Sequence, residues 1–189
     1  MEQRPWGPGR RPGAPTGMSD VEGLLAYEEI RQLVARYALA VTSADLDAVV
    51  ELFVDDVQAT RDRSGRAALR EVFAEMMTSP VSVLNIGTHV INLLGPDDAA
   101  GTVLCVAEMG DLGTWARQLI AYEDTYARRD GAWYFVRRNH QLFYGVETAE
   151  RPLDQPEAQW PRNQLGRGSL PQGWPSWRAF HGVDDVRTA

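Results

Sequence analysis

The spacing of apolar residues changes once along this chain, next to Pro80, and this change constrains the fold more than any other feature. Before Pro80, apolar side chains recur every three or four residues, which predicts amphipathic helices. From Val81 to about Tyr144 they alternate with polar residues, as in strands that bury one face. Helices followed by a run of strands favour an α+β domain with the helices packed on one face of the sheet.

The helical part contains three apolar stripes. They predict helices at about residues 21–42, 46–53 and 69–76. A short strand at residues 57–61 is expected just before the third helix. The helices would thus cover one face of whatever sheet follows them.

The second part predicts long strands joined by tight turns. The expected strands are residues 81–94, 101–109, 114–128 and 132–144. Gly, Pro and Asp residues mark each turn between them, for example Asp130-Gly131. Strands of this length usually bend, so we expect a mainly antiparallel sheet that curves around an interior.

The two ends of the chain differ in composition from its middle. Residues 1–17 are rich in Pro, Gly and Arg and are predicted to be disordered. Residues 18–147 would form the domain itself. Residues 148–189 are dense in Pro, Gly and Trp. That many aromatic groups is unusual in a disordered segment, so we expect the extension to dock on its own domain or on a neighbouring subunit.

Composition narrows the classes of function. A length of 189 residues suits one domain with extensions. The net charge of −7 gives no support to nucleic-acid binding, which calls for a basic face. No apolar stretch approaches the length of about 18 residues that a membrane span needs. The start of the chain carries no secretory signal and Cys105 has no cysteine partner, so a cytoplasmic protein is expected.

Neither a metal site nor a cofactor site is predicted. The three histidines have no metal-ligand spacing. No glycine-rich phosphate loop leads from a strand into a helix. Any chemistry would therefore depend on the side chains alone.

His89 is the ionisable residue that most invites a functional interpretation. It lies in the apolar run 83–94, where strict alternation would place it on one face with Val83, Ile91 and Leu93. The ordinary pKa of imidazole lies near working pH. Either the fold satisfies His89 as a core residue, or His89 is placed to move a proton.

Three segments carry a resemblance to a known family. They are the helical stretch 27–56, the tripeptide Gly87-Thr88-His89, and residues 122–135, which end in Asp-Gly-Ala-Trp-Tyr-Phe. Together they resemble the SnoaL-like family of the nuclear transport factor two-like superfamily, which is related to scytalone dehydratase, ketosteroid isomerase and bile-acid dehydratase. The resemblance covers residues 21–144, most of the expected domain.

This resemblance implies a cone-shaped α+β barrel, in which about three N-terminal helices pack on a strongly curved, mainly antiparallel sheet. It also implies an apolar pocket for a small apolar substrate, and assembly as a homodimer or homotrimer. The pocket would be lined by residues from several elements: Val41, Phe53, Met76, Trp115, Tyr122 and Leu142.

The resemblance also suggests catalytic roles. His89 would act as base or acid, and Tyr37 would polarise a substrate carbonyl. The family's orienting aspartate and second histidine have no counterpart, because Leu39, Thr42 and Leu119 stand at the candidate positions.

Two other residues could supply the missing proton-transfer group: His140, the first choice, and Asp124. Tyr37 and both of these residues also have a purely structural interpretation. Tyr37 could be core packing, Asp124 a simple strand position, and His140 a solvated strand end.

The expected function is a cofactor-independent general acid–base enzyme, a dehydratase-type lyase or an isomerase or cyclase. Its substrate would be an apolar oxygenated small molecule, from secondary metabolism or from aromatic or steroid breakdown. The alternatives are a non-catalytic small-molecule-binding or assembly module, and the small subunit of an oxygenase.

Overall fold

The computed structural model describes residues 15–110, 113–159, 161–163 and 165–183. Most of the segment predicted to be disordered, residues 1–14, lies outside that range. Three helices precede four strands, as the sequence predicts. The elements are α1 (Asp20–Thr42), α2 (Leu46–Glu51), α3 (Arg66–Met76), β1 (Val81–Leu93), β2 (Asp98–Gly110), β3 (Trp115–Arg129), β4 (Ala132–Glu147), the 3₁₀ turn η1 (Pro152–Asp154) and α4 (Pro175–Phe180).

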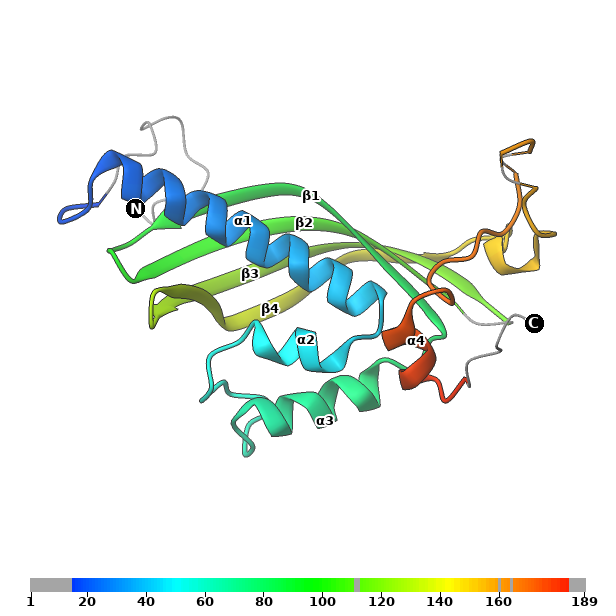
Figure 1. Ribbon diagram of the computed structural model, residues 1–189, viewed down its shortest axis with the longest axis horizontal. Helices are drawn as coiled ribbons and strands as arrows, with labels where there is room; N and C mark the ends of the chain where they lie inside the picture. The colour runs from blue at the N-terminus through cyan, green and yellow to red at the C-terminus, as the bar shows by residue number, and fades with distance from the viewer. Residues whose placement is uncertain (1–14, 111–112, 160, 164, 184–189) are drawn as a thin grey trace.

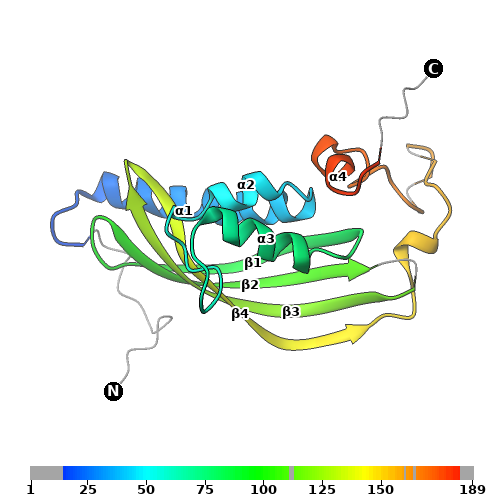
Figure 2. The same cartoon turned by 90° about the horizontal axis from the view of Figure 1, so that it is seen from below.

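The four strands form one antiparallel sheet in the order β1-β2-β3-β4. The sheet is curved and α1, α2 and α3 lie on one of its faces (Figures 1 and 2). The α+β prediction is therefore confirmed. Among the described residues the sheet does not close into a barrel, and β1 and β4 are its two outer strands.

Helix α1 packs its apolar stripe against the sheet. Ser19 caps its start and exchanges hydrogen bonds with Glu22 in a capping box, which satisfies exposed backbone N–H groups. Its apolar stripe, with Ile30, Val34 and Tyr37, is buried in the core. Tyr37 thereby reaches the inner face of the sheet, where Phe135 lies 5.7 Å away between ring centroids.

The strand predicted at residues 57–61 is not formed. The chain turns back on itself there, and the backbone N–H groups of Ala59 and Thr60 both donate to the carbonyl of Arg63. The only ladder pairing within this turn is an isolated bridge from Gln58 to Ser64. A turn that satisfies its own backbone groups leaves nothing to pair with the sheet.

A bulge in β1 changes which residues share a face with His89. Ile86 pairs with Cys105, but the next pair is His89 with Val103, so the register shifts by one residue. A bulge of this kind reverses side-chain alternation on one side of it. Val83 therefore pairs with Glu108 and lies on the outer face. The prediction that Val83 shares a face with His89 is wrong.

The C-terminal extension contacts its own domain. The Ser176 hydroxyl donates to the Ser43 carbonyl at 2.9 Å, and Nε1 of Trp177 donates to the Pro80 carbonyl at 2.7 Å. These bonds attach α4 where α1 ends and β1 begins (Figure 1). Among the described helices, none combines the length and apolar character of a membrane span.

Candidate functional site

The inner face of the sheet carries polar residues from β1, β3 and β4 at one level, under α1. Register places Gly101 opposite Asp124, and Asp124 opposite Arg138. Two residues further along β2 from Gly101, Val103 lies opposite His89 of β1. Cross-strand neighbours on one face have side chains in contact range. Polar groups distant in sequence thus meet inside the domain.

Asp124 and Arg138 form a buried ion pair. Nη2 of Arg138 lies 3.4 Å from Oδ2 of Asp124, with 3% and 0% of the two side chains exposed. Burial raises the pKa of Asp124 to about 6, although the positive charge of Arg138 acts in the opposite direction. At neutral pH Asp124 is mostly ionised, and it becomes protonated under mildly acidic conditions.

Tyr126 links this pair to His89. Its hydroxyl donates to Oδ2 of Asp124 at 2.9 Å and lies 3.2 Å from Nε2 of His89. Gly101 leaves room for this arrangement. A Cβ atom at Gly101 would lie 3.1 Å from the Tyr126 hydroxyl and 2.9 Å from the Val90 carbonyl. The strand facing Asp124 therefore needs a residue without a side chain.

These contacts define the tautomer of His89. A tyrosine hydroxyl has one proton, and here it goes to Asp124. The bond between Tyr126 and His89 therefore requires Nε2 of His89 to be the donor. In a neutral imidazole the other nitrogen, Nδ1, then carries the free lone pair.

His89 is neutral over the working pH range. Burial, together with the positive charges of Arg138 and Arg31, lowers its pKa to about 4. A proton that reaches Nδ1 would create an imidazolium ion whose Nε2–H is directed through Tyr126 toward the Asp124 carboxylate. The arrangement can thus accept a proton and return it.

Aromatic rings surround the guanidinium group of Arg138. Its central carbon lies 4.2 Å from the ring centroid of Tyr37, 4.0 Å from that of Tyr122 and 4.7 Å from that of Phe135. Ring faces attract a cation at these distances. Burial raises the pKa of Tyr37, so its hydroxyl stays protonated and can donate a hydrogen bond.

A family model for the SnoaL-like domain matches residues 22–139 of the chain. The protein belongs to the SnoaL-like family. This confirms the resemblance carried by the helical opening, the Gly87-Thr88-His89 tripeptide and the β3–β4 hairpin.

Solved structures share this fold at low identity. A proposed scytalone dehydratase from Novosphingobium aromaticivorans is 18% identical, with a TM-score of 0.61, over 70% of this chain and 94% of that one. The hexachlorocyclohexane dehydrochlorinase LinA-type3 from Novosphingobium barchaimii is 19% identical, with a TM-score of 0.61, over 69% and 95% of the two chains. An NTF2-like protein from N. aromaticivorans is 28% identical, with a TM-score of 0.53, over 67% and 92%.

The predicted catalytic residues do not all meet within this SnoaL-like domain. His89 and Asp124 are joined through Tyr126, and Tyr37 lies against Arg138. His140 shares the face of Arg138 but is solvent-exposed, with its ring 5.8 Å from that of Tyr122. Of the predicted groups, His140 is the one that lies at the edge of the site.

The six residues predicted to line one pocket do not lie together. Val41, Phe53 and Tyr122 are buried in the core under the helices. Met76 at the end of α3 and Leu142 on β4 are exposed.

Trp115, the sixth predicted pocket residue, is buried at the far end of the sheet. Its Nε1 donates to Glu108 at 3.3 Å. It belongs to a different part of the molecule from His89.

The positions that depart from the family pattern have other roles. Leu39 is exposed on α1, and Leu119 pairs with Val106 and Tyr144 on the outer face of the sheet. The Thr42 hydroxyl accepts a hydrogen bond from the backbone N–H of Leu84 at 3.2 Å and so holds α1 to β1. These residues leave the proton-transfer role to others.

Sequence reasoning did not assign roles to Tyr126 and Arg138. Strand parity already places Tyr122, Asp124 and Tyr126 on one face, and Arg138 on the face of His140. An acidic residue between two tyrosines, with an arginine at matching parity on the next strand, was the available signal. The pairing of the two strands was needed to join them.

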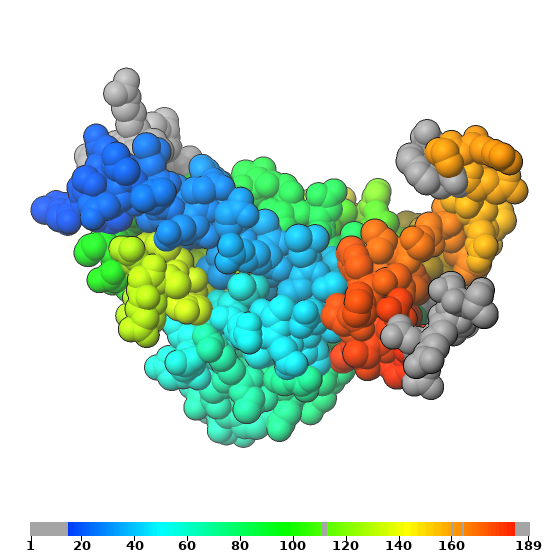
Figure 3. Space-filling model, viewed as in Figure 1, coloured from blue at the N-terminus to red at the C-terminus, as the bar shows by residue number. Residues whose placement is uncertain are grey.

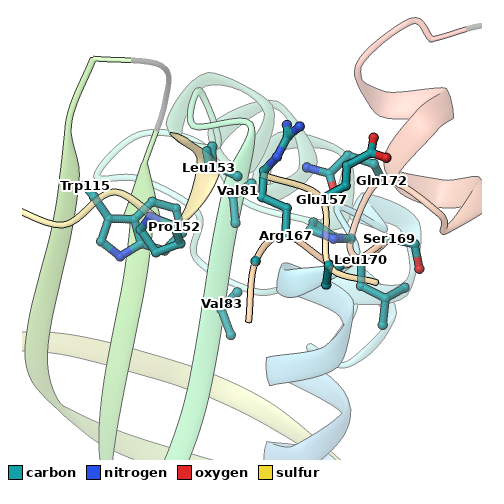
Figure 4. A pocket seen from close by; sticks show the side chains of 14 residues that line it. Val81, Val83, Trp115, Pro152, Leu153, Glu157, Arg167, Ser169, Leu170 and Gln172 are labelled. Atoms are coloured by element: carbon teal, nitrogen blue, oxygen red, sulfur yellow. The ribbon is translucent and has the colours of Figure 1, made fainter. Parts of the chain in front are cut away.

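A pocket lies elsewhere, between the C-terminal extension and the far end of the sheet (Figure 4). Figure 3 shows this extension in orange and red at one end of the molecule. It has a volume of about 760 Å³, and Val81, Trp115, Leu153 and Leu170 are among its lining residues. His89 and Arg138 are not among them. Its walls are mostly apolar side chains and backbone groups, so it is better suited to holding an apolar group than to catalysis.

Proposed function

We propose that this protein is a cofactor-independent acid–base enzyme that catalyses an elimination, of the dehydratase type, or a double-bond isomerisation. The substrate is an apolar, oxygenated small molecule. One observation carries the proposal: His89 is neutral, and Tyr126 and Asp124 anchor its Nε2, so that Nδ1 remains free as a base.

The reaction begins with proton abstraction. Nδ1 of His89 takes a proton from the carbon next to a carbonyl, and the electron pair moves into the new double bond as the group on the neighbouring carbon departs. The His89 imidazolium then gives its proton to a departing hydroxyl, which leaves as water. In an isomerisation, the same proton returns to a different carbon.

The neighbouring groups support these steps. Tyr37 keeps its proton and would donate a hydrogen bond to the substrate carbonyl, where negative charge develops. The Asp124 carboxylate, reached through Tyr126, would stabilise the imidazolium of His89. His140, exposed at the edge of the site, would assist only a substrate that extends that far.

The structural neighbours support this choice of reaction class. Two of them are named for eliminations, a scytalone dehydratase and a hexachlorocyclohexane dehydrochlorinase. In both reaction types a proton and a leaving group depart from adjacent carbons. The shared fold raises the expectation of such chemistry, while the local groups around His89 specify how it would proceed here.

The experiment is a turnover assay with aromatic β-hydroxy ketones, in which a conjugated product is detected by its ultraviolet absorbance. His89→Ala should lower turnover by about 10²- to 10⁴-fold in a folded protein, as loss of a proton-transfer group does. His181→Ala, in the C-terminal extension, is the matched control and should keep wild-type turnover. A folded His89→Ala protein that retains turnover would contradict the proposal.

A second candidate is a non-catalytic binding module. The observation in its favour is that the polar side chains of the site contact one another in a continuous chain, from His89 through Tyr126 and Asp124 to Arg138. A binding module would be stabilised by its ligand without converting it. His89→Ala would then leave the ligand's affinity within a few-fold of wild type.

We also propose that the protein assembles into a homodimer or homotrimer. Val83, Tyr144 and Val146 are exposed apolar residues on the outer face of the sheet. Exposed apolar patches often mark interfaces. Light scattering coupled to size-exclusion chromatography should give a mass above the monomer's, and Tyr144→Glu should lower it. A wild-type monomer at working concentration would contradict this proposal.

A further inference from the structure

The guanidinium group of Arg138 is buried with most of its hydrogen-bonding capacity unused by the protein. Within the described part of the chain, no protein atom accepts a hydrogen bond from its Nε, Nη1 or Nη2. Its one charged contact is the 3.4 Å approach of Nη2 to Asp124, and Oδ1 of Asp124 is also without a hydrogen-bond partner. Asp124 instead receives the hydroxyl of Tyr126.

This arrangement is costly unless another group completes it. A buried charge without hydrogen bonds loses its hydration, and a single long contact does not replace that loss. A structural arginine would be expected to engage its carboxylate through two parallel bonds. Here Asp124 is shared with Tyr126, so the two-pronged edge of Arg138 is left for a different acceptor.

The aromatic rings determine how that acceptor can approach. Tyr37 and Tyr122 lie 4.2 Å and 4.0 Å from the guanidinium carbon, and ring faces at that distance cover the cation. An acceptor must therefore enter at the edge of the guanidinium, where its N–H groups point. A planar carboxylate matches this edge, and the rings offer apolar contact to the rest of the ligand.

We propose that Arg138 binds the carboxylate of an apolar organic acid, with Tyr37, Tyr122 and Phe135 packed around it. This deepens the proposed function, because it makes the substrate a carboxylate-bearing apolar molecule held beside His89. The binding itself requires no turnover. The anion site and the acid–base chemistry can therefore fail independently.

A bound carboxylate would also act on His89. The charged or titratable groups that reach His89 are Arg31 on α1, Tyr126 and Asp124 on β3, and Arg138 on β4. Arg138 is one of the charges that lower the pKa of His89. Neutralising Arg138 with an anion removes that influence, so the ligand would make His89 a stronger base as it binds.

The test uses the full chain and three anions: phenylacetate, formate and chloride. Phenylacetamide serves as the uncharged match of phenylacetate. Binding is followed by the rise in melting temperature and by calorimetry. Arg138→Met removes the charge but keeps an apolar stem. Arg137→Met is the matched control, since Arg137 is the adjacent residue and is exposed on the opposite face of β4.

Phenylacetate should stabilise the wild type and Arg137→Met, and bind about 10- to 100-fold more weakly to Arg138→Met, as expected for loss of a charge-assisted pair. Phenylacetamide should have no effect on any of them. In the wild type, saturating phenylacetate should also move the titration of the His89 ring proton signals to higher pH. His89→Ala should still bind phenylacetate.

Several outcomes would overturn the proposal. One is an equal response of Arg138→Met and wild type, and another is an equal response to the amide and the acid. Stabilisation by formate or chloride but not by phenylacetate would identify a small-anion site instead. If Arg138→Met does not fold, the Nε–H signal of Arg138 in the wild type, labelled with ¹⁵N-arginine, decides. It must shift with phenylacetate and not with the amide, and an unmoved signal would mean that only water completes the group.

Discussion

The two halves of the sheet differ in what covers them. The inner face at Gly101, Asp124 and Arg138 lies under α1, α2 and α3, and its polar groups are buried. Beyond these helices β4 continues along the edge of the sheet (Figure 2). Its residues from His140 to Glu147 are exposed. The C-terminal extension lies against that far half and forms one side of a pocket there.

The covered half of the sheet holds the titratable groups with shifted pKa values, and the far half holds the pocket. In the covered half, low exposure shifts the pKa of His89 to about 4 and that of Asp124 to about 6. In the far half lies a pocket of about 760 Å³, which is lined mostly by apolar side chains and backbone. Substitutions in the covered half should therefore have large effects on stability and on titration, and those in the far half small ones.

The largest effect is expected at the buried ion pair. Asp124→Ala leaves Arg138 charged and without its partner, and should lower the free energy of unfolding by about 3–5 kcal/mol in urea titrations. Asp47→Ala removes the exposed ion pair with Arg70, whose atoms are closer at 2.6 Å, and should cost no more than about 1 kcal/mol. Equal losses would mean that burial does not distinguish the two pairs.

Glycines in the two halves give a second comparison. Gly101→Ala forces a Cβ atom against the Val90 carbonyl at 2.9 Å and should destabilise the protein by about 1–3 kcal/mol. Gly145→Ala on the exposed end of β4 meets only the Gln118 side chain, with Cγ at 3.5 Å in an ordinary contact, and should change stability by about 0.5 kcal/mol or less. Thermal unfolding of the two variants ranks them, and the reverse order would contradict the packing described around Tyr126.

The pH dependence of stability should separate His89 from Asp124. Burial lowers the pKa of His89 from 6.5 to about 4, so the unfolded chain binds more protons in that window and stability falls on acidification. The pKa of Asp124 is raised from 3.8 to about 6, so the native state binds more protons and stability falls as pH rises through that window. The two effects oppose each other in the wild type.

Single variants expose each effect. His89→Asn should be more stable at pH 4.5 than at pH 6.5, and Asp124→Asn should be less stable at pH 4.5 than at pH 6.5, with differences on the order of 1–2 kcal/mol. Denaturant titrations at the two pH values measure this. Parallel slopes for the two variants would show that the two groups do not titrate in opposite senses.

The smallest effect belongs to the C-terminal extension. Trp177→Phe removes the 2.7 Å hydrogen bond to the Pro80 carbonyl and should cost about 1 kcal/mol. Limited proteolysis should then cut the extension sooner, while the titration of His89 stays unchanged. A shifted His89 titration would show that the two halves are coupled.

The fold could be predicted because its signals are local. The stripe through Ile30, Val34 and Tyr37 indicates a helix by spacing alone, and turn residues such as Asp130-Gly131 mark where the chain reverses. The order of helices and strands then favours α+β packing. The length of the strands predicted a curved sheet, and the family resemblance supported that prediction.

The site could be predicted only in part, because side-chain direction depends on bulges. Strict alternation assigned Val83 to the face of His89, and the bulge after Ile86 reverses that assignment. A second register shift lies between the pairs Thr125–Arg137 and Tyr126–Phe135. Gly87 lies within the first shift, and a glycine inside a strand often marks a bulge. The meeting of Arg138 with Asp124 follows from the pairing of β3 with β4 and not from residue spacing.

The most direct test of the account is the state of His89 itself, measured by ¹⁵N chemical shifts of histidine-labelled protein across pH. We expect a neutral ring at pH 7 with the proton on Nε2 and a free Nδ1, titrating only near pH 4. A ring that carries its proton on Nδ1, or that titrates at its ordinary value of 6.5, would contradict the proposal that His89 is held ready as a base.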